Sequence, residues 1–288
     1  MNHSCKSKKN VLWIAGVLIG LVLMMEGFLR TTGIQAEYAE NNLQANLSRI
    51  GQYDFEPPPE NLILGSSLSA RLLPSLFPAG KGRFGNLALD GSGVPMGLEI
   101  VKKRKERPLR IYLEANSIFF RSLHNEQMLR QAISNPIYTM SRFLYCLRPG
   151  SRPSALLYAW LKKTREANEK GVSGVQPMQT EVSIKPMSNE EQAALRQIPF
   201  QGVQLFFVLV PSGRGEAHPT GELLRIVGEI GGTWIEPRKW LEDNGAYLRY
   251  TDGLHLDRVS AQEVCNAIAN ASYHKAIDSS QKRDPSPH

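Results

Sequence analysis

The chain has 288 residues, of which 42% are hydrophobic and 21% are charged. This composition supports a folded domain with a buried core and excludes a wholly disordered chain. Three cysteines without a C-x-x-C pair exclude a disulfide-built miniature fold. The net charge of +7 comes without a stripe of Lys and Arg interleaved with aromatic residues, so we expect no nucleic-acid partner.

Residues 11–29 form an apolar run that follows three lysines within residues 6–9. Its 19 residues are close to the roughly 20 that a helix needs to cross a membrane. The positive-inside rule then places residues 1–10 in the cytoplasm and the rest of the chain outside it. We therefore predict a single-pass protein of the inner (cytoplasmic) membrane, with its domain on the periplasmic or extracellular face and residues 11–29 in contact with membrane lipid.

Two other interpretations of this run are weaker. A cleavable signal peptide needs a small-x-small site, which residues 34–36 match poorly. A buried core helix seldom stands at an extreme N-terminus behind lysines. We assign residues 30–58, which are polar and lead into Pro57-Pro58-Pro59, to a stalk. The folded part is expected over residues 59–276 and a disordered tail over 277–288.

Within the folded part, short apolar runs alternate with stretches of helical periodicity. We predict strands at residues 61–64, 83–89, 109–113, 204–210 and 233–235. We predict helices at residues 66–73, 94–105, 124–133, 154–169, 189–197, 221–229 and 261–275. This alternation favours an α/β layer fold with a mostly parallel sheet. Such sheets bind their ligands at the carboxyl ends of the strands.

Four polar clusters follow predicted strands or precede the last helix: residues 65–69, 90–93, 114–116 and 252–255. Ser67, at a strand-to-helix turn, is a candidate nucleophile, and His255 is a base that can take its proton. Asp252, three residues earlier, can orient the imidazole. The backbone amides of Ser67 and Gly91, together with the Asn116 carboxamide, are candidates for an oxyanion hole. These parts together predict an acyl-transfer site.

Each cluster also has a plainer interpretation. Asp252 could simply cap a loop by accepting a backbone N–H, and Ser69 is an alternative nucleophile that falls beyond the turn. A metal site built from Asp252, His255 and Asp257 is weaker still, because zinc sites usually recruit more nitrogen or sulfur ligands. We expect no metal and no cofactor.

The order Ser, Gly, Asn and then Asp-x-x-His near the C-terminus resembles the SGNH (GDSL-type) hydrolase superfamily. The resemblance assigns the nucleophile, the oxyanion glycine, the oxyanion asparagine, the acid and the base to Ser67, Gly91, Asn116, Asp252 and His255, respectively. Gly91 follows Asn86 by five residues, as in the family pattern. Three positions depart from that pattern: Ser66 stands where the family usually has Asp, Glu114 where it has Gly, and Ser117 where it has Asp.

The resemblance implies a three-layer, flavodoxin-like fold, with residues 121–200 as an insertion. It also implies a serine esterase or O-acyltransferase that acts on acyl esters, acetyl first among them, of cell-envelope polysaccharide. The substrate would then be a polysaccharide or an acyl carrier, and envelope-assembly proteins are candidate partners. A catalytically inactive binding or assembly subunit at the envelope is the alternative. Cys146 and Cys265 either pair or remain two free thiols.

Overall fold

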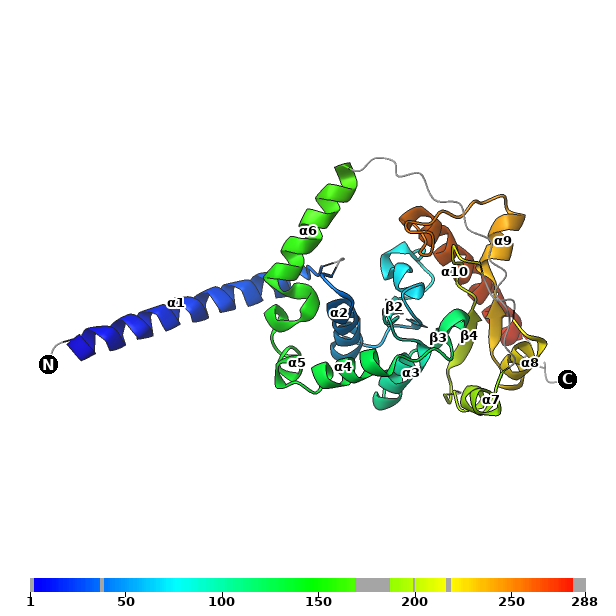
Figure 1. Ribbon diagram of the computed structural model, residues 1–288, viewed down its shortest axis with the longest axis horizontal. Helices are drawn as coiled ribbons and strands as arrows, with labels where there is room; N and C mark the ends of the chain where they lie inside the picture. The colour runs from blue at the N-terminus through cyan, green and yellow to red at the C-terminus, as the bar shows by residue number, and fades with distance from the viewer. Residues whose placement is uncertain (1–2, 37–38, 169–186, 199, 216–218, 282–288) are drawn as a thin grey trace. The chain divides into compact units, whose positions relative to one another are not determined.

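The computed structural model describes residues 3–36, 39–168, 187–198, 200–215 and 219–281. The chain divides into two compact units (Figure 1). Unit 1 comprises residues 1–51 and 128–170, and unit 2 comprises residues 52–127 and 171–288. Residues 128–170, which lie inside the predicted insertion at 121–200, therefore belong with the N-terminal region and not with the sheet.

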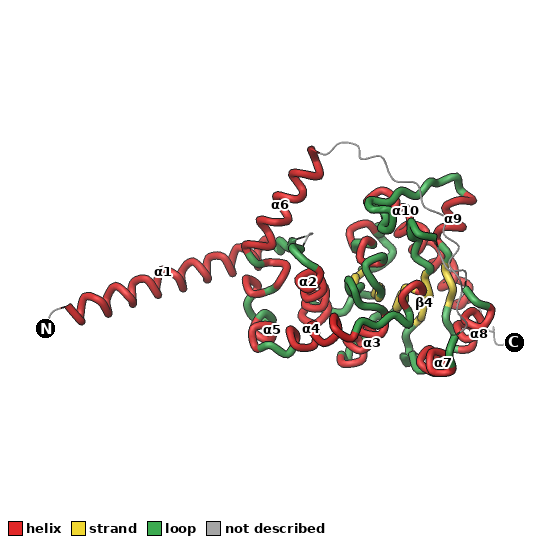
Figure 2. The backbone as a smooth tube through the Cα atoms, viewed as in Figure 1, coloured by secondary structure: helices red, strands yellow, loops and turns green. Residues whose placement is uncertain are grey.

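Unit 2 is built on a five-stranded, all-parallel sheet, drawn in yellow in Figure 2. Its strands are β1 (Asn61–Leu64), β2 (Phe84–Asn86), β3 (Arg110–Glu114), β4 (Gln204–Val208) and β5 (Thr233–Ile235). Their order in the sheet is β2-β1-β3-β4-β5. This is the strand order of flavodoxin-like doubly wound folds, in which the chain reverses direction across the sheet between β1 and β3. The predicted α/β class and the parallel sheet are confirmed.

The strands read as continuous apolar runs because both faces of the sheet are covered. One face presents Ile63, Tyr112 and Phe206, which are neighbours in the register of β1, β3 and β4. These side chains share a core cluster with Val264 and Ile268 of α10 (Arg258–Gln281). Helix α10 therefore covers this face of the sheet.

The opposite face packs against α3 (Val94–Lys103) and α8 (Gly221–Glu229). Helix α3 approaches β1 closely at Gly97, where an added Cβ would lie 3.2 Å from the Leu64 side chain. Next to α8, an added Cβ at Gly232 would lie 2.7 Å from the ring of Phe207. With helices on both faces, unit 2 has three layers.

The remaining helices include α4 (Leu123–Ile133) and α7 (Asn189–Arg196), both close to their predicted positions. Helix α9 (Pro237–Asp243) was not anticipated. Helix α10 continues to Gln281, so the predicted tail at 277–288 begins too early; residues 282–288 lie outside the described part of the chain.

The predicted helix at residues 66–73 is wrong. Only one single-turn 3-10 segment, η1 (Ser69–Arg71), forms within this range, and a second, η2 (Pro74–Leu76), follows it. The reason is tertiary. The Glu114 carboxylate accepts the backbone N–H groups of Ser66 and Ser69, and the Asn86 amide donates to the carbonyls of Ser69 and Leu72. These bonds hold the backbone in a turn that local periodicity does not reveal.

The predicted stalk at residues 30–58 contains a helix, α2 (Asn42–Phe55). Asn46, Ile50 and Tyr53, spaced four and three residues apart, are buried along one side of α2. That spacing places them on one helical face. The polar composition of the stretch hides this face, so this part of the chain is not a simple linker.

Unit 1 contains no strand among its described residues. It begins with α1 (His3–Thr32), whose segment Asn10–Thr32 is long and apolar enough to span a membrane. Unit 1 also holds residues 42–51 of α2 and residues 128–133 of α4. Its remaining helices are α5 (Pro136–Met140) and α6 (Pro153–Asn168), with the 3-10 turns η4 (Tyr145–Leu147) and η5 (Pro149–Ser151) between them. Cys146 in unit 1 and Cys265 in α10 are both free thiols.

Candidate active site

Ser67, His255 and Asp252 form a continuous chain of hydrogen bonds in unit 2. The Nε2 atom of His255 lies 2.9 Å from the Oγ atom of Ser67. Its Nδ1 atom lies 2.7 Å from the Oδ2 atom of Asp252. Ser67 and His255 are 188 residues apart in the sequence. The fold therefore brings a hydroxyl, an imidazole and a carboxylate together in the order that nucleophile, base and orienting acid require.

The charge on Asp252 determines which imidazole nitrogen carries the proton. Partial burial raises the pKa of this carboxyl, but hydrogen bonds from the backbone and imidazole of His255 and from the backbone of Leu254 outweigh that effect, and the pKa falls to about 2. An ionised carboxylate only accepts hydrogen bonds, so Nδ1 must donate to it. In the neutral imidazole Nε2 is then the acceptor, and the Ser67 hydroxyl donates to it.

A short loop holds the acid and the base together. The Oδ1 atom of Asp252 accepts the N–H groups of Leu254 and His255 at 3.0 and 2.8 Å, while its other oxygen contacts the imidazole. The loop is closed by an antiparallel bridge between Tyr250 and Leu256. Asp252 therefore does cap a backbone turn, and the same carboxylate also orients His255.

The turn that carries Ser67 is organised by a buried carboxylate. Glu114, the last residue of β3, is 1% exposed. Its carboxylate accepts the Ser66 hydroxyl at 2.6 Å, the Ser66 N–H at 2.9 Å and the Ser69 N–H at 3.0 Å. The backbone on both sides of Ser67 is thus fixed to the carboxyl end of the neighbouring strand.

Gly65 leaves the space in which Glu114 lies. An added Cβ at Gly65 would lie 2.5 Å from the Glu114 Oε2 atom and 2.6 Å from the Ser69 Oγ atom, which is closer than real Cβ atoms approach. From sequence, Glu114 is one residue of a polar cluster and a departure from a family pattern, and its contact with the Ser66–Ser69 turn is not predicted. Its position at the end of a buried strand was the available signal.

The two other oxyanion candidates, Gly91 and Asn116, are held by well-defined local structure. Gly91 lies in a turn closed by a bond from the Ser92 N–H to the Leu89 carbonyl, and its φ of 68° favours glycine. The Asn116 carboxamide pairs with the backbone of Val210: its oxygen accepts the N–H at 2.9 Å, and its nitrogen donates to the carbonyl at 3.1 Å. One N–H of Asn116 is used in this pair, and a primary amide has two.

Ser67 follows β1 and Asn116 follows β3, the two strands between which the chain direction reverses. Ligands of doubly wound sheets bind at this switch point, outside the carboxyl ends of the strands. The polar clusters therefore lie where this class of fold places its sites.

The structure does not support the alternative nucleophile or the metal site considered from the sequence. Ser69 is 1% exposed, which argues against its use as a nucleophile. Asp257 accepts the Ser260 N–H at the start of α10 and pairs with Arg249 at 3.0 Å, and it makes no contact with His255 in the described structure. Within the described ranges, no group of three His, Cys, Asp or Glu side chains is arranged to hold a metal ion.

Fold and site together define a doubly wound α/β protein with a Ser-His-Asp hydrogen-bond chain at the switch point of its sheet. Comparison with protein-family models, with curated proteins and with solved structures found no match.

Proposed function

We propose that the chain is a membrane-anchored, extracytoplasmic serine esterase or O-acyltransferase of the SGNH type. The observation that carries the proposal is the unbroken contact from Ser67 through His255 to Asp252, at 2.9 and 2.7 Å. Asp252 and His255 come from a single loop, whereas Ser67 comes from the opposite end of the domain sequence. A binding subunit without turnover has no need of this arrangement.

The reaction begins at Ser67. As its Oγ attacks the carbonyl carbon of an acyl ester, the hydroxyl proton passes to Nε2 of His255. Ionised Asp252 stabilises the imidazolium through the Nδ1–H bond. The resulting oxyanion is held by the Ser67 and Gly91 amides and by the remaining N–H of Asn116.

Collapse of the tetrahedral intermediate breaks the bond to the leaving alcohol, which takes the proton from His255. The acyl group then remains on Ser67. In a second cycle, water or a sugar hydroxyl attacks the acyl carbon and gives its proton to His255. The bond between the acyl group and Ser67 then breaks, and the Ser67 oxygen takes the proton back from His255. The same residues therefore serve both hydrolysis and transfer, and access of water decides between them.

The substrate class rests on the proposed topology and on the SGNH resemblance. If α1 spans the inner membrane with its lysines inside, the site faces the cell envelope. Acyl esters of envelope polysaccharide, or an acyl carrier that delivers the group, are the substrates available there, and envelope-assembly proteins are the proposed partners.

The proposal is tested on the full chain in detergent with a fluorophosphonate serine probe and with an activated acetyl ester. We expect labelling and acetate release that are lost in Ser67→Ala. Ser75→Ala is the matched control, because Ser75 is an exposed serine of the same unit outside the site, and it should behave as the wild type. Both variants are checked for unchanged thermal unfolding.

Full labelling of Ser67→Ala would refute the assignment of the nucleophile. A folded wild-type chain that neither labels nor releases acetate would refute the esterase and leave the inactive binding or assembly subunit as the better description.

A further inference from the structure

Unit 1 carries an apolar surface that no part of the described chain covers. We call it the α5–α6 surface. Its members are exposed by 51% to 68%: Ile137, Met140, Phe143, Leu157, Trp160 and Leu161. On α6, Leu157, Trp160 and Leu161 follow the i, i+3, i+4 spacing that places them on one helical face. Large exposed apolar side chains on connected elements of this kind mark a site of interaction with a membrane or a protein.

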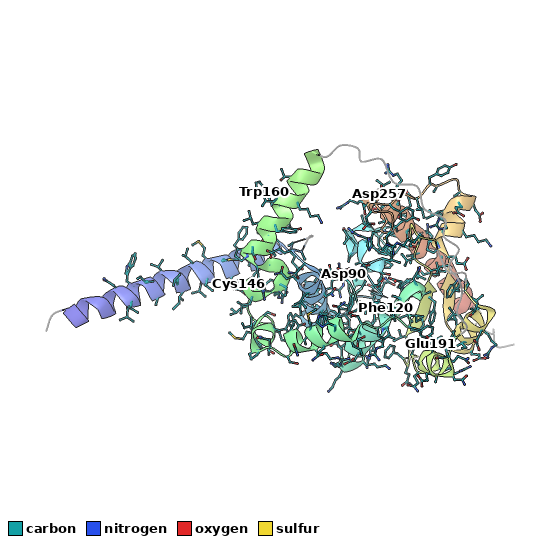
Figure 3. All side chains as sticks on the ribbon, viewed as in Figure 1. Asp90, Phe120, Cys146, Trp160, Glu191 and Asp257 are labelled. Carbon is teal, nitrogen blue, oxygen red and sulfur yellow. The ribbon has the colours of Figure 1, made fainter. Side chains whose placement is uncertain are left out.

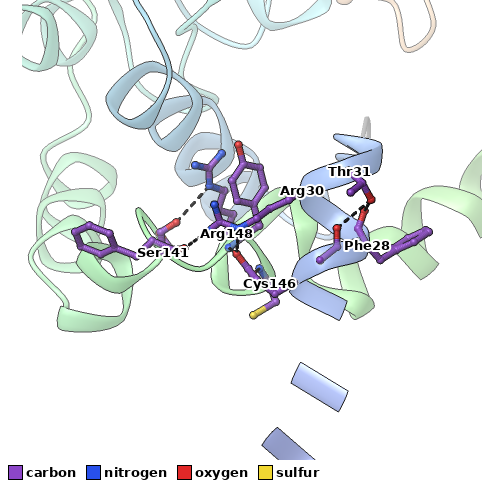
Figure 4. A network of polar contacts seen from close by, with 10 residues as sticks. Phe28, Arg30, Thr31, Ser141, Cys146 and Arg148 are labelled. Atoms are coloured by element: carbon purple, nitrogen blue, oxygen red, sulfur yellow. Dashed lines mark hydrogen bonds and ion pairs between the residues drawn. The ribbon is translucent and has the colours of Figure 1, made fainter. Parts of the chain in front are cut away.

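The α5–α6 surface is joined to the C-terminal end of α1 by a polar network, shown in Figure 4. Glu26 of α1 is 7% exposed and accepts the N–H groups of Tyr145 and Cys146 at 2.9 and 3.0 Å. Arg30 contacts Glu26 at 2.7 Å, donates to the carbonyl of Phe143 and lies over the ring of Tyr145. These bonds fix the turn η4, and Phe143 beside it, to the last two turns of α1.

The same connection extends to α6. The Ala36 N–H donates to the carbonyl of Gly150 at 2.7 Å. Turn η5, which contains Gly150, contacts both η4 and α6. Trp160 and Cys146 are labelled in Figure 3 on these neighbouring parts of unit 1. The surface is therefore held both to the last turns of α1 and to the segment that follows α1.

The depth of the network in a bilayer follows from helix geometry. From Val11 to Glu26 the helix rises about 22 Å, at 1.5 Å per residue, and the hydrocarbon core of a bilayer is about 30 Å thick. Glu26 thus falls in the outer part of the span and Arg30 near its edge. Phe143 and Tyr145, which contact these two residues, lie at the level of the headgroups.

Charge supports the same location. No Asp or Glu occurs from residue 127 to residue 165. Seven basic residues occur there: Arg130, Arg142, Arg148, Arg152, Lys162, Lys163 and Arg165. A segment of this charge is attracted to anionic lipid headgroups. Basic side chains beside Trp and Leu are the composition of helices that lie in the membrane interface.

We propose that the α5–α6 surface lies in the interfacial layer of the bilayer that α1 crosses, with its six apolar side chains at the boundary between headgroups and acyl chains. The inference rests on the proposed membrane anchoring by α1. Unit 1 would then bind the membrane in two ways: α1 spans the bilayer, and α5 and α6 lie at its interface.

The test uses the full chain in nanodiscs that contain phosphatidylglycerol and lipids brominated at defined depths, which quench tryptophan fluorescence on contact. The chain has four tryptophans, Trp13, Trp160, Trp234 and Trp240. In the variant Trp13→Phe, we expect lipids brominated near the headgroups to quench most of the fluorescence of Trp160. That emission is identified by comparison with the double variant Trp13→Phe/Trp160→Phe.

Quenching of Trp160 by aqueous iodide but not by brominated lipid would overturn the proposal and favour a protein partner for the surface. The anchoring itself is tested in Trp160→Phe, where deep bromines should quench Trp13. If Trp13 is quenched and Trp160 is not, only the surface proposal fails. If Trp13 is not quenched either, the proposed anchoring fails as well.

Discussion

The hydroxyl of Ser66 donates to the Oε1 atom of Glu114 over 2.6 Å, and this bond joins two positions at which the chain departs from the SGNH pattern. The pattern has a carboxylate at the first position and glycine at the second. Here the carboxylate comes from the strand and the small polar side chain from the turn. We infer that the two departures compensate for each other, because the charge stays at the turn beside Ser67.

Glu114→Gln should weaken both the fold and the site. In the wild type, the Glu114 carboxylate accepts hydrogen bonds from three donor groups of Ser66 and Ser69. In the variant, the NH2 group of the glutamine would face at least one of these donors and could not accept its hydrogen bond. Leaving a buried donor without a partner costs about 1–3 kcal/mol. We expect a loss of that size in the free energy of unfolding, measured by urea denaturation, together with slower fluorophosphonate labelling of Ser67.

Glu106→Gln is the matched control for this variant, since its side chain is 71% exposed and makes only a surface pair with Arg104. It should change stability by at most about 1 kcal/mol.

Ser66→Asp alone should be destabilising because it sets two carboxylates against each other. Adding Glu114→Gln to it should recover part of that loss. Strictly additive effects would contradict the compensation.

Asp252→Asn should leave the loop folded but reduce turnover. The amide can still accept the backbone N–H groups of Leu254 and His255 at its oxygen. However, its NH2 group would then face Nδ1 and favour the imidazole tautomer that cannot take the Ser67 proton. Acid–base groups of this kind contribute on the order of 10²–10⁴-fold to rate. Hydrolysis of the activated acetyl ester measures the loss, and an unchanged rate would remove Asp252 from the proposed mechanism.

The free energy of unfolding should depend on the ionisation of Asp252 at low pH. Its folded-state pKa of about 2 lies below the ordinary value of 3.8. The stabilisation is therefore fully present above pH 3.8 and is lost as the pH falls through about 2. The stability difference between the wild type and Asp252→Asn should narrow in that acid range. A difference that does not change between pH 5 and pH 2 would contradict the prediction.

Gly65→Ala should be destabilising because the methyl group would overlap Glu114 and Ser69. Overpacking of this kind costs about 1–3 kcal/mol. Gly228→Ala in α8 is the matched control: nothing lies within 4 Å of its added Cβ. Alanine favours a helix interior over glycine by about 0.5–1 kcal/mol, so this control should be neutral or stabilising. Urea denaturation of the two variants should therefore give shifts of opposite sign or clearly different size.

The sheet and the triad were accessible from sequence because both depend on local patterns. Buried parallel strands are short apolar runs, and Ser67, Asn116 and His255 stand in polar clusters at or beyond their ends. The hydrogen-bond partners of Glu114 could not be predicted, because they lie 45 and 48 residues away and no periodicity links them to it. The false helix at 66–73 arises because tertiary bonds from Glu114 and Asn86 outweigh the local signal. Helix α2 is missed for another reason: the polar composition of residues 30–58 hides its buried face.

The acid and the base lie three positions apart on one loop that closes on itself between Tyr250 and Leu256. Their mutual geometry is consequently set mainly by bonds within this loop, which is itself held to the segment after β4 by a bond from the Gly213 N–H to the Leu254 carbonyl. Only one distance, from Ser67 to His255, has to be established by the whole domain. A sequence that keeps residues 250–256 and the turn that carries Ser67 therefore keeps the hydrogen-bond chain, and its other surface residues can change without disturbing that chain.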